Sequence, residues 1–187
     1  MLLISTCNKE DNGDQKYLQA VDKLCDILKQ HGDIKIVTNV WDYINVSNPV
    51  QWFNENVKIC RYIILICTPL GKKNWLNNIS NDLFVRGFQM LRNQRTNKRW
   101  FSSNSHNFSV IYFDDDPRLC IPDEMNQDKI KYKNISKNLN LFLKKVTSKN
   151  LDTDNELVVS FKTAVNFGIN SRSNDSKPLL YENGKAI

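Results

Sequence analysis

Six consecutive apolar residues, YIILIC at positions 62–67, constrain the fold of this chain more than any other feature. A strand with one face in water alternates apolar and polar side chains, whereas an unbroken apolar run indicates a strand that is covered on both faces. Strands of that kind belong to parallel sheets that lie between layers of helices. The run therefore predicts an α/β fold.

Shorter apolar runs alternate with helical stripes along the rest of the chain. Further strands are predicted at 2–4, 34–41 and 108–113, and helices at 14–31, 49–57, 80–91 and 135–146. The second helix has the clearest start, because Asn48 is a favoured N-cap residue, Pro49 suits the first helical position and Gln51 stands at the capping-box position. This rhythm indicates a flavodoxin-like open parallel sheet with helices on both faces.

The chain has 187 residues, which suits one domain with an extension. We place the domain at residues 1–147 and the extension at 148–187, because the composition shifts to Asn, Ser, Asp and Lys after about Val146. We expect the extension to be polar and partly disordered, with an apolar patch at 157–161 that docks back on the domain. Within the domain, residues 93–107 form a basic loop whose length indicates a functional or mobile segment.

The cysteines and the hydropathy pattern bear on the compartment. The five cysteines form an odd set without a C-x-x-C pair, mostly among apolar neighbours, as expected of buried free thiols in a reducing compartment. No stretch approaches the ~20 apolar residues that span a bilayer, and the N-terminal MLLISTC is interpreted as a first strand and not as a signal peptide. We therefore expect a cytoplasmic location. The net charge of +6 permits an anionic partner without selecting its class.

The carboxyl ends of the predicted strands are where a parallel sheet would hold a ligand. None carries a glycine-rich phosphate-binding motif. Cys67 stands at a strand end, as a phosphatase nucleophile would, but Lys73 lacks the bidentate fork of arginine and Pro69 removes a backbone donor. We interpret Cys67 as a buried structural thiol and Asp114–Asp116 as a solvated acidic loop. With only two histidines, no triad or zinc site can be assembled, so we expect no catalytic residue, cofactor or metal.

Several local motifs, in this order and spacing, resemble the SEFIR family, the TIR-related cytoplasmic domain of interleukin-17 receptors and of their U-box adaptor CIKS. The resemblance covers the chain from its first strand to about Val146. After the opening strand and helix, its pieces are TNVWDY (38–43), PVQW (49–52), RYIILICTP (61–69) with Trp75 after it, LFVRGFQML (83–91), FSVIYFDDD (108–116) with Ile121-Pro122-Asp123, and a final amphipathic helix. Pro69-Leu70 is a mild departure, because relatives often have a small Ser-Pro or Ser-Gly turn there.

The resemblance implies a fold of the SEFIR/TIR type and homotypic association that carries a signal from a cytokine receptor to its adaptor, a role in innate immunity. The partners implied are SEFIR domains of a receptor or an adaptor, in a homo- or hetero-oligomer. The sequence contains neither a U-box nor a transmembrane segment, so we expect a receptor tail fragment or a stand-alone SEFIR protein. Contact with a membrane would then occur only through a receptor span that this chain lacks.

A cation-rich segment supplies the predicted recognition surface. From Lys72 to Arg99 there are seven Lys and Arg residues and one acidic residue, Asp82. An excess of one sign suits an acidic patch on a partner domain, where charge complementarity sets orientation and association rate. The residues assigned to this surface are Lys72, Lys73, Trp75, Asp82, Arg86, Gln89, Arg92 and Arg95.

Two other functions compete with this interpretation. Some TIR relatives hydrolyse NAD with a glutamate on the helix after the third strand, but residues 75–91 contain only Asp82 as an acid. A nucleic-acid-binding domain would use the basic loop at 92–101, in which Trp100 stands among Arg95, Lys98 and Arg99. We expect neither NAD hydrolysis nor nucleic-acid binding.

Overall fold

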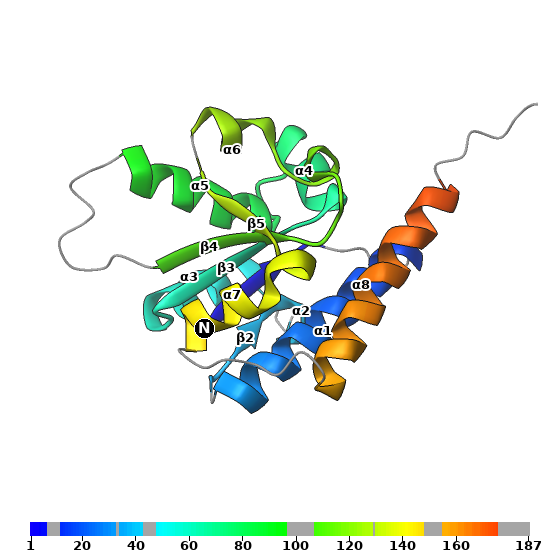
Figure 1. Cartoon of the computed structure of the whole chain (residues 1–187). Coiled ribbons are helices and arrows are strands. Elements are labelled where there is room, and N and C mark those ends of the chain that lie inside the picture. The colour runs from blue at the N-terminus through cyan, green and yellow to red at the C-terminus, as the bar shows by residue number, and fades with distance from the viewer. Residues whose placement is uncertain are drawn as a thin grey trace, which may run out of the picture.

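A five-stranded sheet forms the centre of the protein. The computed structural model describes residues 1–6, 12–32, 34–42, 48–96, 107–128, 130–147 and 155–175. The strands lie in the order β2-β1-β3-β4-β5 and every neighbouring pair is parallel (Figure 1). Their bounds are β1 Leu2–Ser5, β2 Val37–Thr38, β3 Tyr62–Cys67, β4 Asn107–Tyr112 and β5 Tyr132–Asn134. The prediction of a flavodoxin-like open parallel sheet is confirmed.

Helices cover both faces of this sheet. Their bounds are α1 Asn12–Gly32, α2 Asn39–Asp42, α3 Pro49–Ile59, α4 Pro69–Leu76, α5 Leu83–Thr96, α6 Asp123–Gln127, α7 Ile135–Thr147 and α8 Glu156–Asp175, with a 3-10 helix at Pro117–Leu119. One core cluster joins the sheet to α1, α7 and α8, and a second joins it to α3, α5 and α6. Within the described residues, no helix combines the length and the hydropathy needed to cross a bilayer.

Strand β3 explains why its sequence is apolar without a break. Ile64 and Ile66 belong to the core cluster with α1 and α7, whereas Ile63 and Leu65 belong to the cluster with α3 and α5. Successive side chains of a strand point to opposite faces, so a strand with helices on both sides has no wet face. The interpretation of YIILIC as a strand covered on both faces is confirmed.

The start of α3 also follows the sequence. The Asn48 side chain accepts a hydrogen bond from the Gln51 backbone N–H at 3.0 Å, and Pro49 occupies the first turn. The Gln51 side chain donates to Glu55 Oε1 at 2.8 Å, one turn further along the helix. The N-cap prediction is therefore confirmed.

Only Val37–Thr38 of the predicted strand at 34–41 is a strand: residues 34–36 have no regular secondary structure, and helix α2 begins at Asn39. The strand ends at Thr38 because of Asn39, whose side chain exchanges two hydrogen bonds with the backbone of Ser5: Ser5 N–H donates to Oδ1 at 3.0 Å and Nδ2 donates to the Ser5 carbonyl at 2.6 Å. The Asn39 side chain thus forms the hydrogen bonds to β1 that the backbone of the next strand residue would form. The backbone of residue 39 can therefore start a helix. The prediction also lacked the helices α4, α6 and α8, the 3-10 helix at Pro117–Leu119 and the short edge strand β5.

The described part of the predicted extension 148–187 is helix α8, which lies alongside α1 (Figure 1). Its side chains Val158, Phe161 and Val165 are buried in the same core cluster as α1 and α7. Phe161 meets Phe113, the residue that follows β4, edge to face with ring centroids 6.0 Å apart. These three residues of α8 therefore belong to the core of the sheet domain.

Candidate interaction surface on helix α5

Helix α5 carries most of the predicted recognition surface, and Asp82 fixes its start. The Asp82 carboxylate accepts hydrogen bonds from the Val85 backbone N–H at 2.9 Å, from the Thr6 hydroxyl at 2.8 and 3.0 Å, and from Asn74 Nδ2 at 3.0 Å. It therefore caps the helix and ties it to the end of β1 and to α4. Asp82 was assigned to the recognition surface, and the structure gives its carboxylate these contacts within the chain.

Helix α4 is placed by a second cap at the end of β3. The Thr68 side chain accepts a hydrogen bond from the Gly71 N–H at 3.0 Å, and Pro69 takes the first turn. Gly71 is buried, and a Cβ there would lie 3.2 Å from the Phe84 ring. Helices α4 and α5 thus approach closely, which brings Trp75 of α4 next to the side chains of α5.

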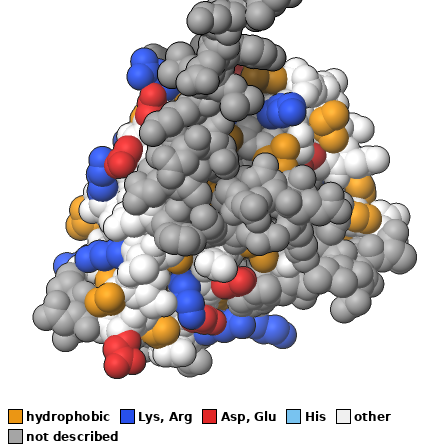
Figure 2. Space-filling view, turned by 90° about the vertical axis from the view of Figure 1, so that its right-hand side faces the viewer, with side chains coloured by type: hydrophobic (Ala, Val, Ile, Leu, Met, Phe, Trp, Pro, Cys, Tyr) orange, Lys and Arg blue, Asp and Glu red, His pale blue; other side chains and the backbone are white. Residues whose placement is uncertain are grey.

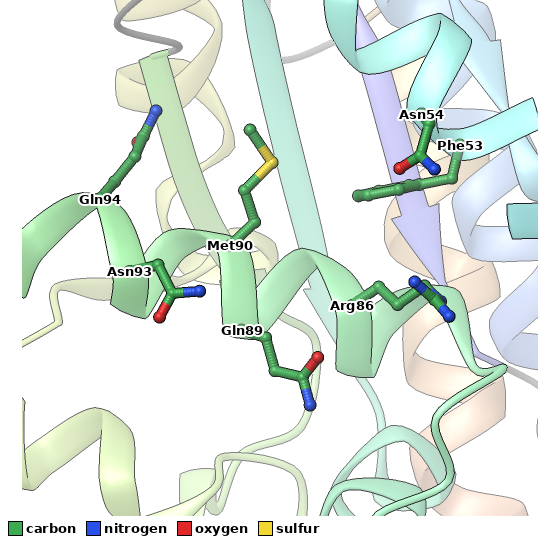
Figure 3. Close-up of a pocket in the computed structure, with 7 residues that line it drawn as sticks. All are labelled: Phe53, Asn54, Arg86, Gln89, Met90, Asn93 and Gln94. Atoms are coloured by element: carbon green, nitrogen blue, oxygen red, sulfur yellow. The ribbon is translucent and has the colours of Figure 1, made fainter. Parts of the chain in front are cut away.

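A pocket of about 300 Å3 lies between α3 and α5. Figure 3 shows the residues that line it: Phe53, Asn54, Arg86, Gln89, Met90, Asn93 and Gln94. The lining thus combines an arginine and four carboxamide side chains with one aromatic ring and one thioether. Carboxamides both donate and accept hydrogen bonds, so the pocket suits a polar group with more than one hydrogen-bonding atom.

Arg86 is the residue of this pocket whose bonding is incomplete. Its Nε atom is buried and has no hydrogen-bond partner among the described residues. The side chain, which is half-buried, leaves the first turns of α5 beside Phe53 and Asn54 of α3 (Figure 3). A buried donor without an acceptor costs about 1–3 kcal/mol, more when the group is charged, so an acceptor supplied by a ligand would remove that cost.

A second, adjoining hollow of about 450 Å3 is lined by Trp75, Gln89, Arg92 and Asn93. The Trp75 ring packs against Phe88 with centroids 4.5 Å apart, and the Arg92 guanidinium carbon lies 5.7 Å from the Trp75 ring centroid. Gln89 and Asn93 line both hollows. The exposed face of α5 therefore presents one continuous polar strip with a recess on each side.

The charge of this surface differs from the count along the sequence. Lys72 donates to the Arg118 carbonyl at 2.7 Å and lies 3.7 Å from the Asp123 carboxylate. Arg92 forms an ion pair with Asp128. Asp123 and Asp128 lie outside the segment Lys72–Arg99. The ratio of seven basic residues to one acidic residue in that segment therefore overstates the positive charge of the folded surface.

The remaining predicted residues are less constrained. Lys73 is exposed, and no described carboxylate forms an ion pair with Lys73 or Arg86. Arg95 lies in the last turn of α5, and its side chain falls outside the described part of the structure. The prediction of a loop at 93–107 is wrong at its ends, because α5 continues to Thr96 and β4 begins at Asn107; residues 97–106 lie outside the described residues.

Sequence reasoning missed the residues that complete the pocket. Phe53 is buried in the core cluster with α5 and its ring also lines the pocket, while no motif in the sequence points to Asn54. Met90 lies on α5 four residues after Arg86, and Gln94 lies four residues after Met90. Helical spacing therefore places both on the side of the helix where Arg86 lies. Only the packing of α3 against α5 reveals that these side chains share a pocket.

The described side chains at the carboxyl ends of β3 and β4 are buried or form ion pairs within the chain. Cys67 is fully buried and burial, with a smaller contribution from the nearby Cys120, raises the pKa of its thiol. Asp115 pairs with Lys137 at 2.9 Å and Asp116 with Arg118 at 2.9 Å, while Asp114 is buried.

Figure 2 views the molecule from the side toward which the strands run. Charged side chains of both signs are intermixed on its described surface. No group of three or more His, Cys, Asp or Glu side chains in the described ranges could hold a metal ion. The four described cysteines are buried free thiols, as predicted: Cys25, Cys60, Cys67 and Cys120.

Models of known protein families give no match to this chain, and neither do curated proteins. The resemblance to SEFIR domains therefore rests on the sequence motifs described above.

Proposed function

We propose that this chain is a protein–protein association module that docks onto a partner domain through the exposed face of α5 and the adjoining Trp75. The observation that carries the proposal is the Arg86 Nε atom, which is buried without a described acceptor in a pocket bordered by carboxamides. A carboxylate from a partner that enters the pocket would pair with the Arg86 guanidinium in charge-assisted hydrogen bonds. The module itself would catalyse no reaction.

The side chains around Arg86 support docking of a protein rather than turnover of a substrate. Trp and Arg are the residues most enriched at the energetic centres of interfaces, and here Trp75 and Arg92 lie one recess away from Arg86. Gln89 and Asn93 offer hydrogen bonds that can adapt to a partner. The hollows are open and lie on a helix face, outside the strand ends where α/β enzymes hold their ligands.

The sequence resemblance suggests that the partner is another SEFIR domain, from an interleukin-17 receptor or its adaptor, in the cytoplasm. The chain also has exposed acids of its own, because Asp115 and Asp123 are 68% and 79% exposed. In a contact between two copies, one of these acids of one copy would meet Arg86 of the other. Such a contact pairs unlike residues and leaves a free surface at each end for further association.

The test measures binding of the purified chain to an immobilised SEFIR domain of an interleukin-17 receptor and of CIKS. Arg86→Glu places a negative charge where a partner carboxylate would lie, and we expect the dissociation constant to rise about thirtyfold or more. Arg92 is left unchanged, because it pairs with Asp128 and its replacement would disturb the fold. Lys162→Glu, the same charge change on the exposed side of α8, serves as the matched control.

Circular dichroism of each variant verifies that the fold is intact. Equal binding by the wild-type chain, Arg86→Glu and Lys162→Glu would contradict the proposal, and so would the absence of binding to either domain. Release of nicotinamide from NAD by the purified chain would instead identify an enzyme. Affinity for RNA or DNA that persists at physiological salt would identify a nucleic-acid-binding protein.

A further inference from the structure

A further recess lies on the edge of β4, where strand β5 does not cover it. Strand β4 begins at Asn107, but β5 pairs with it only from Val110, which stands opposite Tyr132. Before Tyr132 the chain is held elsewhere, because the Ile130 N–H donates to the Met125 carbonyl of α6 at 2.8 Å. The first three residues of β4 therefore run without β5 beside them, and a pocket of about 460 Å3 opens there.

The floor of this recess is apolar and reaches both cores of the protein. Ile111 and Phe142 belong to the core cluster with α1 and α7, whereas Leu91, Val110 and Ile130 belong to the cluster with α5 and α6. The edge strand of a parallel sheet normally separates these two cores from solvent. Here the late start of β5 leaves a slot through which apolar side chains of both layers border the same space.

Three lysines surround the slot. Lys131 precedes β5, Lys133 lies within it, and Lys145 comes from the last turns of α7. All three are exposed, and none forms an ion pair with a carboxylate in the described ranges. An apolar recess with an uncompensated cationic rim is complementary to a molecule that has an apolar body and an anionic head.

Lysines on an exposed sheet edge also have a simpler role, since they discourage pairing with strands of other molecules. That role accounts for Lys131 and Lys133 at the edge strand. It requires neither a recess with an apolar floor nor the convergence of Lys145 from a different element. An extended peptide added to a sheet edge gains its affinity mainly from backbone hydrogen bonds, whereas this slot offers apolar side chains with lysines around them, so a small ligand with an apolar body fits it better.

We propose that this slot is a binding site for a medium-chain fatty carboxylate, with the alkyl chain against the apolar floor and the carboxylate between Lys133 and Lys145. The volume of the slot falls within the range of small-molecule pockets, about 300–1,000 Å3. The apolar floor supplies affinity through the area that it removes from water, and the lysines supply selectivity for an anion. This proposal is independent of the α5 surface.

The probe is decanoate, used as a monomer below its micellar concentration. We expect the full chain to bind it with a dissociation constant on the order of 10–100 µM by calorimetry. The amide signals of β4 and α7 should shift in a ¹⁵N-labelled sample during the same titration. The double variant Lys133→Gln/Lys145→Gln removes both charges at the rim and should weaken decanoate binding about tenfold or more.

Two comparisons make the result decisive. Uncharged 1-decanol should bind the wild-type chain and the double variant equally, because only the lysine contacts have been removed. Lys162→Gln on α8 should leave decanoate binding unchanged, and so should Arg86→Glu, which affects only the proposed association surface.

Equal decanoate affinity of the wild-type chain and the double variant would overturn the proposal. Binding to vesicles of phosphatidylglycerol without binding of monomeric decanoate would also overturn it and would indicate a membrane-facing basic surface. If neither decanoate nor vesicles bind, the lysines only protect the sheet edge.

Discussion

Replacing Asp82 with alanine removes a carboxylate that three parts of the fold share. The carboxylate caps α5 through the Val85 N–H, accepts the Thr6 hydroxyl at the end of β1, and accepts Nδ2 of Asn74 in α4. The loss of an N-cap side chain costs about 1 kcal/mol, and hydrogen bonds to a charged group contribute roughly 1.5–3 kcal/mol each when sheltered. Asp82 is partly exposed, so we expect Asp82→Ala to lower the free energy of unfolding by about 2–4 kcal/mol.

Asp82→Asn is the informative companion variant. The asparagine oxygen can still accept the Val85 N–H, but the second acceptor oxygen and the charge are lost. Asparagine is also among the best N-cap residues. We therefore expect Asp82→Asn to cost about 1 kcal/mol, clearly less than the alanine variant.

Urea denaturation followed by circular dichroism measures both values, provided that the slope of the transition is unchanged. For a chain of this size the alanine variant should melt about 6–12 °C below the wild type. Asp115→Ala is the matched control, because Asp115 is exposed and forms a single surface ion pair with Lys137, which is worth less than about 1 kcal/mol. An Asp82→Ala variant within about 0.5 kcal/mol of the wild type would refute the assignment of Asp82 as a structural cap.

Three further experiments test the packing. Gly87→Ala would place a Cβ 2.6 Å from Leu65 Cδ2, so we expect a loss of about 1–3 kcal/mol despite the better helix propensity of alanine. The same change in a Leu65→Val background, which lacks that atom, should cost much less, and a double-mutant cycle without coupling would contradict the close approach. Phe161→Ala should destabilise the chain by about 3–5 kcal/mol because Phe161 is buried against Phe113. An unchanged urea midpoint would contradict the packing of α8 into the core. Burial raises the pKa of the Cys67 thiol, so iodoacetamide at pH 8 should label Cys67 only after unfolding. Labelling is measured by mass spectrometry, and equal labelling in buffer and in urea would contradict the burial of Cys67.

Much of the fold was predictable because it depends on local patterns. The apolar run 62–67 predicted a doubly covered strand, and Asn48-Pro49 predicted the start of α3; both are present in the structure. The failures have different causes. Helix α4 starts with a local cap, Thr68-Pro69, that resembles the start of α3 and was overlooked, whereas the end of β2 depends on a contact between distant parts of the chain. Strand β2 ends at Thr38 because the Asn39 amide bonds to Ser5 of β1, which no local pattern in 34–41 reveals.

The candidate surface was predictable only in outline. Arg86, Gln89 and Asn93 follow one another at helical spacing, and all three line the same pocket in the structure. The pocket itself required Phe53 and Asn54 of α3, which lie more than thirty positions earlier in the chain.

By itself, the sequence determined the fold class and the elements that carry the surface, because apolar periodicity and capping residues act over a few neighbouring positions. Only the tertiary structure decided which charges on that surface stay uncompensated. It brings Asp123 to Lys72 and Asp128 to Arg92, while Arg86 receives no carboxylate from the described chain. Electrostatic interactions depend on distance in space and not on separation along the chain, so a count of charges along a segment could not predict this outcome.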